Sequence, residues 1–161
     1  MHQLKYWKVS ESVIDPVFAT SGSACFDIRA WITGESSTLT ASGQWPGDLS
    51  TYIHPNETRL IPTGLVFDIP GGFSVRLHPR SGLSINQGIT LANCEGVIDY
   101  DYVEPVFVGL HNQSQSTFEI KNGDRICQAE LQKTEYLILQ QVNEKPLPKS
   151  DRDGGFGSTG R

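Results

Sequence analysis

Residues 93–102 read Asn93-Cys94-Glu95-Gly96-Val97-Ile98-Asp99-Tyr100-Asp101-Tyr102. The segments on both sides of this stretch are apolar and partly β-branched, which predicts a β-hairpin or a strand–turn–strand unit in which Gly96 supplies unusual backbone angles. Successive side chains of a strand point to opposite faces. We therefore expect Ile98 to anchor the strand in a core, Asp99 to face a cleft, and the turn to expose Asn93 together with Asp99.

A purely structural role for these polar residues is equally consistent with this stretch. Asp and Asn side chains commonly hydrogen-bond the backbone of their own turn. The remaining segments of the chain decide between the two interpretations.

The length and composition favour one domain made of short strands. The chain has 161 residues, 37% of them apolar, with sixteen glycines and nine prolines, which indicates many turns rather than long helices. Apolar runs punctuated by Gly and Pro recur from residue 4 to a last expected strand at 136–142. This spacing predicts an all-β sandwich, jelly roll or barrel with at most one short helix, at 81–87.

The charge and the cysteines exclude several classes. A net charge of −5 argues against a general nucleic-acid binder, whereas a small phosphorylated ligand needs only a few local cations. Cys25, Cys94 and Cys127 are odd in number and lack metal-binding spacing, so we expect reduced, buried or semi-buried thiols in a cytoplasmic protein. No signal-peptide run and no stretch of transmembrane length is present in the sequence.

Three further segments carry candidate binding groups. Arg80, Ser81 and Gly82 open the expected helix and suit an anion, although Ser81 could be a plain N-cap. Asp27 stands between two apolar residues, so it needs a partner, either an arginine or a ligand. Gln128 is an uncharged donor that could reach a phosphate.

Residues 154–161 form a glycine-rich end that has too few apolar side chains to hold itself folded. The segment nevertheless carries an aromatic ring, two hydroxyls and an arginine, which is typical of a mobile lid. A disordered linker end is the alternative, but it has no need for Phe156.

Residues 33–51 are rich in Ser, Thr and Gly, which predicts an inserted surface loop.

Taken together, five segments resemble the ordered motifs of the trimeric deoxyuridine triphosphatases. They are residues 24–28 (Ala-Cys-Phe-Asp-Ile), 79–83 (Pro-Arg-Ser-Gly-Leu), 96–102 (Gly-Val-Ile-Asp-Tyr-Asp-Tyr), 123–128 (Gly-Asp-Arg-Ile-Cys-Gln) and 154–160 (Gly-Gly-Phe-Gly-Ser-Thr-Gly). The resemblance implies a jelly-roll-like β-barrel over residues 1–150, a flexible lid at 151–161, and a homotrimer with shared active sites. It also implies hydrolysis of dUTP to dUMP and diphosphate with Mg²⁺, which limits uracil in DNA and supplies dUMP.

The resemblance assigns a role to each matching position. Asp99 would be the general base that activates water. The substrate-binding residues would be Asn93, Gly96, Val97 and Ile98 at the uracil, Tyr102 at the deoxyribose, Arg80, Ser81, Gly82 and Gln128 at the phosphates, and Arg152, Phe156, Gly157, Ser158 and Thr159 from the lid. Asp27 would reach the metal through water. Besides dUTP and copies of itself, no membrane or nucleic-acid partner is expected.

The chain departs from the family pattern in three places. Val103-Glu104-Pro105 stands where the family has an arginine and a glycine. Arg152 is one residue closer to Phe156 than usual, so Arg161 could take its role. The connection at 33–51 is longer than in the family. Two alternative functions stay open. One is a nucleotide enzyme related to the dCTP deaminases, and the other is a binding protein that senses dUTP without hydrolysing it.

Overall fold

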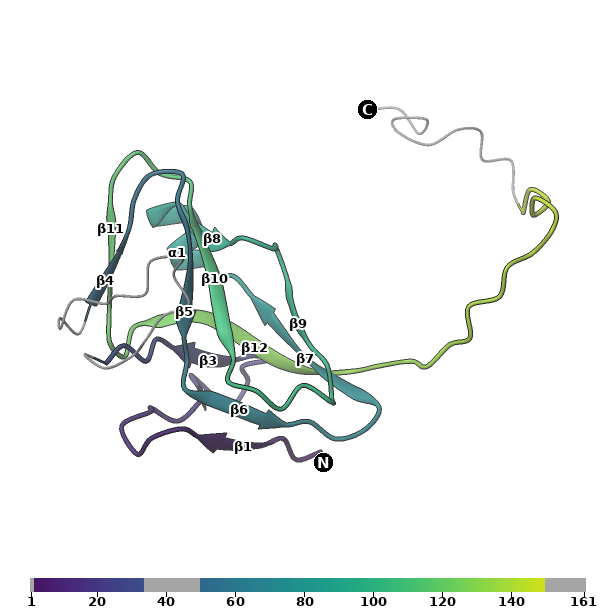
Figure 1. The fold of residues 1–161 in the computed structure, drawn as a ribbon, viewed down its shortest axis with the longest axis horizontal. Helices are drawn as coiled ribbons and strands as arrows, with labels where there is room; N and C mark the ends of the chain where they lie inside the picture. The colour runs from purple at the N-terminus through teal and green to yellow at the C-terminus, as the bar shows by residue number, and fades with distance from the viewer. Residues whose placement is uncertain (1, 34–49, 150–161) are drawn as a thin grey trace.

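The computed structural model describes residues 2–33 and 50–149. In these residues it contains β-strands and one short helix, as Figure 1 shows. The strands are β1 (Lys5–Lys8), β2 (Val17–Phe18), β3 (Phe26–Arg29), β4 (Ser50–Ile53), β5 (Thr58–Pro62), β6 (Leu65–Asp68), β7 (Phe73–His78), β8 (Ile89–Leu91), β9 (Gly96–Ile98), β10 (Phe107–Asn112), β11 (Phe118–Lys121) and β12 (Arg125–Lys133). The helix, α1, spans Ser81–Gln87. The predicted all-β class and the position of the one helix are confirmed.

Two sheets carry most of the fold. The larger has the order β2-β3-β12-β7-β9, and the smaller has the order β5-β10-β8. Two strand pairs, β1-β6 and β11-β4, complete the arrangement, and every pairing is antiparallel. Since most neighbours within the sheets are far apart in sequence, the fold depends on long-range pairing.

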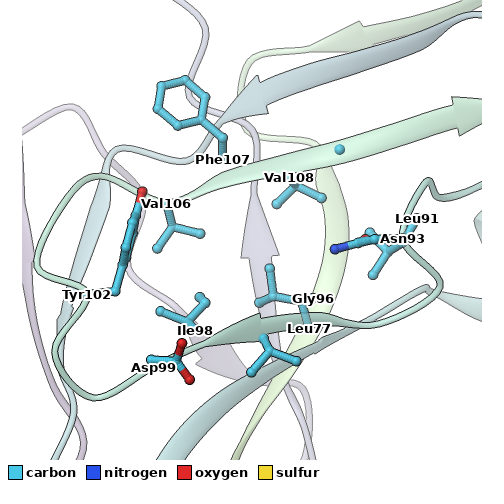
Figure 2. Close-up of a pocket in the computed structure, with 12 residues that line it drawn as sticks. Leu77, Leu91, Asn93, Gly96, Ile98, Asp99, Tyr102, Val106, Phe107 and Val108 are labelled. Atoms are coloured by element: carbon cyan, nitrogen blue, oxygen red, sulfur yellow. The ribbon is translucent and has the colours of Figure 1, made fainter.

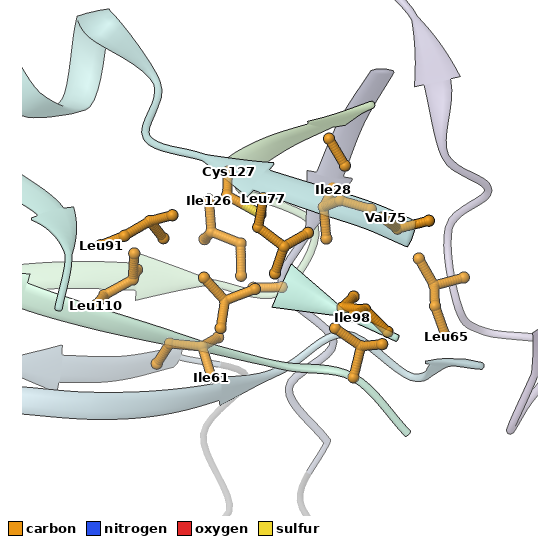
Figure 3. Close-up of a cluster of buried hydrophobic side chains, with 14 of the residues drawn as sticks. Ile28, Ile61, Leu65, Val75, Leu77, Leu91, Ile98, Leu110, Ile126 and Cys127 are labelled. Carbon is orange, nitrogen blue, oxygen red and sulfur yellow. The ribbon is translucent and has the colours of Figure 1, made fainter. Parts of the chain in front are cut away.

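A single apolar core lies between these sheets, as Figure 3 shows. It contains aliphatic side chains from both sheets, among them Ile28, Ile61, Leu65, Val75, Leu91, Ile98, Leu110 and Ile126. Burying one such side chain stabilises the fold by roughly 1.5–3 kcal/mol relative to leaving it exposed. Ile98 is only 7% exposed while its neighbours Val97 and Asp99 are exposed, so the alternation expected for this strand is confirmed.

The stretch at 93–102 is a strand–turn–strand unit rather than a hairpin. β8 pairs with β10 and β9 pairs with β7, so the two strands that flank the turn belong to different sheets. The prediction that Gly96 supplies unusual backbone angles is wrong, because the positive φ of this turn, 61°, is at Cys94. Gly96 is required for space instead: a Cβ there would lie 3.0 Å from the Cβ of Leu77.

The strand expected at 136–142 is absent from the described chain. β12 ends at Lys133, and the following residues extend away from the sheets, as Figure 1 shows. The apolar residues of this segment are all exposed: Tyr136, Leu137, Ile138, Leu139 and Val142. A run of apolar residues cannot make a strand when no neighbouring strand in the described chain pairs with its backbone. We call residues 136–142 the apolar arm.

The three thiols are unpaired and differ in exposure. Cys94 is exposed, Cys25 is half-buried and Cys127 is buried, so the expectation of buried or semi-buried thiols fails for Cys94. Burial, together with the negative charge of Asp27, raises the pKa of the Cys127 thiol to about 12. Burial and the nearby Glu130 also raise the pKa of Cys25.

These differences predict the order of thiol alkylation. Only the thiolate attacks iodoacetamide, so at pH 8 we expect Cys94 to react first, Cys25 slowly, and Cys127 only after unfolding. Peptide mass spectrometry of the native protein over time measures this order. Labelling of Cys127 at the rate of Cys94 in the native protein would contradict it.

In the described part of the chain, no helix is long and apolar enough to cross a membrane.

Candidate active site

Two cavities of the described chain are lined mainly by predicted site residues and their neighbours. The first lies between the two main sheets and has a volume of about 230 Å³. Its walls come from β7, β8, β9 and β10, and Figure 2 shows the side chains that line it. Six predicted site residues lie here: Asn93, Gly96, Val97, Ile98, Asp99 and Tyr102. Asn93 stands on the opposite side of the cavity from Asp99 and Tyr102 (Figure 2). The exposure of Asn93 together with Asp99 is therefore confirmed.

Asp99 directly follows the last residue of β9, so the buried Ile98 fixes its position. Its backbone oxygen accepts a hydrogen bond from the Tyr102 N–H at 3.1 Å. The Tyr102 hydroxyl donates to the Pro105 carbonyl at 3.3 Å, which holds the ring at the edge of the cavity. Among the described residues the Asp99 carboxylate has no hydrogen-bond or ion-pair partner. Its oxygens are therefore available to accept a proton from water.

The second cavity, of about 340 Å³, lies where the loop before α1 meets β3 and β12. Its polar lining includes five predicted site residues, Asp27, Arg80, Ser81, Gly82 and Gln128, together with Arg125. The Gln128 side-chain amide donates to the Pro79 carbonyl at 3.1 Å, which positions it beside the start of the helix.

The Asp27 carboxylate binds two arginines. Arg80 Nε donates to one oxygen at 3.0 Å and Arg125 Nη1 donates to the other at 3.2 Å. Charge-assisted bonds of this kind are stronger than neutral ones, and they satisfy a side chain that is mostly buried. Two guanidinium groups against one carboxylate leave a local charge of +1, so the cavity favours an anion.

Among the described residues, no contact explains the identity of Ser81 and Gly82 at the start of α1. The N-cap is Arg80, without a side-chain cap bond, so the alternative that Ser81 is a plain N-cap is wrong. A Cβ on Gly82 would meet nothing within 4 Å. Space at Gly82 and an exposed hydroxyl at Ser81 leave room for a ligand to approach the backbone closely.

Arg125 is the residue that sequence reasoning missed. Its neighbour Asp124 stabilises the turn before β12, because the Asp124 carboxylate accepts a hydrogen bond from the Lys121 N–H at 2.9 Å. Arg125 instead points to Asp27. Strand alternation alone would not place Arg125 on the face of Gln128, because the two residues are three positions apart. The register of β12 against β3 shifts between Arg125 and Cys127, and such an irregularity changes the face to which a side chain points.

In the described part of the chain, the predicted site residues lie in two separate cavities. The two cavities share no lining residue. The lid residues Arg152, Phe156, Gly157, Ser158 and Thr159 lie outside the described residues, as do Arg161 and most of the loop expected at 33–51. Within the described ranges no three His, Cys, Asp or Glu side chains are grouped to hold a metal ion.

The sequence matches a family model, dUTPase, over residues 48–160. The chain belongs to the dUTPase family. It is 40% identical over 146 residues to the deoxyuridine 5'-triphosphate nucleotidohydrolase of Finegoldia magna, covering 90% of each chain. It is 38% identical to the enzyme of the same name from Wolbachia pipientis subsp. Culex pipiens, covering 99% of this chain and 95% of the relative.

Solved structures place the fold of this dUTPase beside those of phage dUTPases. A Staphylococcus bacteriophage 80alpha dUTPase mutant with dUpNHpp superposes with a TM-score of 0.80 at 19% identity, covering 99% of both chains. A mutant dUTPase from phage phi11 of S. aureus, described with a structural Mg(II) ion, gives a TM-score of 0.71 at 20% identity, covering 89% of this chain and 98% of that one. The expected jelly-roll-like dUTPase fold is confirmed.

Proposed function

We propose that this dUTPase hydrolyses dUTP to dUMP and diphosphate by attack of water on the α-phosphorus. Asp99 is the general base that takes the proton from the attacking water. The observation that carries this proposal is the carboxylate of Asp99 at the cavity edge, which has no hydrogen-bond or ion-pair partner among the described residues. Asp99 directly follows β9, and this strand keeps the Asp99 carboxylate in place while the substrate binds.

The cavity between the sheets takes the nucleoside. Its volume of about 230 Å³ is below the 300–1,000 Å³ range of pockets for drug-sized ligands, so it suits a base and sugar rather than a whole triphosphate. The Asn93 amide and the backbone of residues 96–98 read the uracil edge. The Tyr102 ring packs against the deoxyribose and leaves no room for a 2′-hydroxyl.

The second cavity, which has a local charge of +1, binds the phosphates. Arg80, Ser81, Gly82 and Gln128 contact phosphate oxygens there, and Arg125 adds to this set because it lines the same cavity. Guanidinium groups match phosphate geometry well because they offer donors in a fixed fork. The pairing of Arg80 with Asp27 holds its fork in place before substrate arrives.

The donor set suits Mg²⁺ held mainly by the substrate. This ion binds through one or two carboxylates plus phosphates and keeps several waters, so a single carboxylate at the cavity is sufficient. Asp27, with both oxygens paired to arginines, would contact it through water. When bound, Mg²⁺ would neutralise part of the triphosphate charge.

We further propose that three copies assemble and share their active sites. Large apolar side chains are exposed on the single chain: Trp7 at 63%, Phe18 at 58% and Ile138 of the apolar arm at 94%. Closed symmetric oligomers bury surfaces of this kind. The separation of the two cavities on one chain supports a site in which the nucleoside cavity of one copy meets the phosphate cavity of another.

Residues 151–161 act as the lid of this site, following a domain of residues 1–150. Phe156 covers the uracil, and Gly157, Ser158 and Thr159 contact the distal phosphates together with Arg152 or Arg161. The enzyme works in the cytoplasm, where its three free thiols stay reduced. There it limits uracil in DNA and supplies dUMP.

Diphosphate release measured with each deoxynucleoside triphosphate tests the proposed reaction. We expect release with dUTP in the presence of Mg²⁺ and little with the others. Conversion of dCTP to dUTP or dUMP would identify a deaminase instead. Binding of dUTP without turnover would identify a sensing protein.

Tyr102→Ala tests how the sugar is read. Without the ring, UTP should enter the cavity more easily, so the ratio of kcat/KM for dUTP to kcat/KM for UTP should fall about tenfold or more. A tenfold change corresponds to about 1.4 kcal/mol. Tyr102→Phe is the matched control, because it keeps the ring and removes only the hydroxyl that donates to Pro105. An unchanged ratio in Tyr102→Ala would show that another group reads the sugar.

A further inference from the structure

The turn that joins β8 to β9, residues 92–95, is exposed throughout and carries Asn93. Its backbone is held by few bonds: the Ala92 N–H donates to Gly109, the Cys94 N–H to Leu91, and the Glu95 N–H to Asn93 within the turn. Cys94 has a φ of 61°, a conformation that a residue with a Cβ adopts at a cost. The turn therefore needs an added restraint if Asn93 is to stay in one place.

Glu95 supplies that restraint. Among the described residues it is the only member of the turn whose side chain has a hydrogen-bond or ion-pair partner. One carboxylate oxygen accepts from Arg76 Nη1 at 3.1 Å, and the other lies 3.8 Å from His78 Nδ1. Both partners stand on β7, the strand that pairs with β9.

The partners of Glu95 are themselves held in position. Arg76 Nε donates to Ser74 Oγ at 3.1 Å, which orients the guanidinium along β7. His78 Nε2 lies 3.3 Å from Glu130 Oε1 on β12. The ion pair therefore connects the turn to two central strands of the larger sheet and not to another loop.

We propose that Glu95 is a positioning residue for base recognition, which rests on the proposed role of Asn93 in reading the uracil. The Arg76–Glu95 pair holds the turn against β7, so that the Asn93 amide stays at the edge of the nucleoside cavity. The carboxylate itself does not line that cavity. Its effect on the substrate passes through the position of Asn93.

The test compares Glu95→Gln with the wild type in the full chain. Partly exposed ion pairs of this type shift an equilibrium by up to about fivefold, so we expect KM for dUTP to rise about three- to fivefold and kcat to stay within about twofold. The selectivity for dUTP over dCTP should fall by a similar factor. A loss of fold stability alone would change the melting temperature without changing this selectivity.

Two further variants make the result specific. The charge-swapped pair, Arg76→Glu with Glu95→Arg, should restore most of the selectivity that Arg76→Glu alone removes. Glu130→Gln is the matched control, since Glu130 also faces His78 but the variant leaves the Arg76–Glu95 ion pair intact, so KM should rise less than in Glu95→Gln.

Three outcomes would overturn the inference. The first is that Glu95→Gln keeps the wild-type selectivity for dUTP over dCTP. The second is that the charge-swapped pair does not restore the selectivity that Arg76→Glu removes. The third is that Glu130→Gln raises KM as much as Glu95→Gln does. Asn93→Ala separates this inference from the proposed function. If Asn93→Ala loses selectivity while Glu95→Gln keeps it, only the role of Glu95 fails, whereas full selectivity in Asn93→Ala would remove the base-reading role of the turn.

Discussion

Asp99→Asn is expected to bind dUTP with near wild-type affinity and to hydrolyse it at least about a hundredfold more slowly. The substitution keeps the size and shape of the side chain but removes the charge that draws a proton from water. General-base catalysis contributes roughly 10²- to 10⁴-fold to a rate. The wild-type carboxylate has no ion-pair partner among the described residues, so its replacement leaves no cation unpaired, and the melting temperature should not change.

Single-turnover kinetics and equilibrium binding of dUTP measure these two effects separately. Asp101→Asn is the matched control, because Asp101 is also exposed and is two residues away but does not line the cavity. It should retain wild-type turnover. Near-normal hydrolysis by Asp99→Asn would assign the base to another group, and equal defects in both variants would point to a general charge effect.

Removal of residues 152–161 is the second change for which we expect a large loss of activity. These residues lie outside the described ranges, and the argument rests on their composition: they contain Phe156, two hydroxyls and two arginines but no aliphatic side chain. Closure over a bound substrate excludes water and fixes the triphosphate for in-line attack. We expect kcat to fall about a hundredfold or more, with a smaller loss of dUTP affinity.

Among the described residues, the buried apolar cluster lies between Val13 and Ala129, and residues 152–161 contain no aliphatic side chain that could add to it. The shortened chain should therefore keep the melting temperature and the oligomeric state of the full chain without nucleotide. Phe156→Ala tests the aromatic ring alone, and Arg152→Gln compared with Arg161→Gln shows which arginine contacts the phosphates. Full activity of the shortened chain would reduce the segment to a linker, and loss of folding would make it part of the domain.

Local chemistry explains what could be predicted from the sequence. The alternation that buries Ile98 and exposes Asp99 follows from the geometry of any strand, and α1 at residues 81–87 follows from its flanking Pro79 and Gly88. The predicted residues of the first cavity lie in one stretch, 93–102, and those of the second lie in three short motifs, at 24–28, 79–83 and 123–128. Each of these features depends on neighbours in the sequence.

Features that depend on distant contacts could not be predicted in the same way. The apolar arm has the composition of a strand. A strand also needs a neighbouring strand to pair with, and the residues of the arm do not determine whether one lies beside it. The space requirement of Gly96 comes from Leu77 on another strand, and the site at Glu95 depends on Arg76 nineteen positions earlier. The role of Arg125 depends on Asp27, which is 98 positions away in the sequence.

The division of β8 and β9 between two sheets has a consequence for how this enzyme folds. Because β7 and β9 form one wall of the nucleoside cavity and β8 and β10 form the other, neither sheet alone contains the complete cavity. The cavity exists only after the sheets have docked, which makes nucleotide binding a reporter of the fully assembled domain. A ligand at a hundred times its Kd adds about 2.7 kcal/mol to the stability of that docked state. The nucleotide is therefore a substrate of the protein and also a ligand that shifts its folding equilibrium.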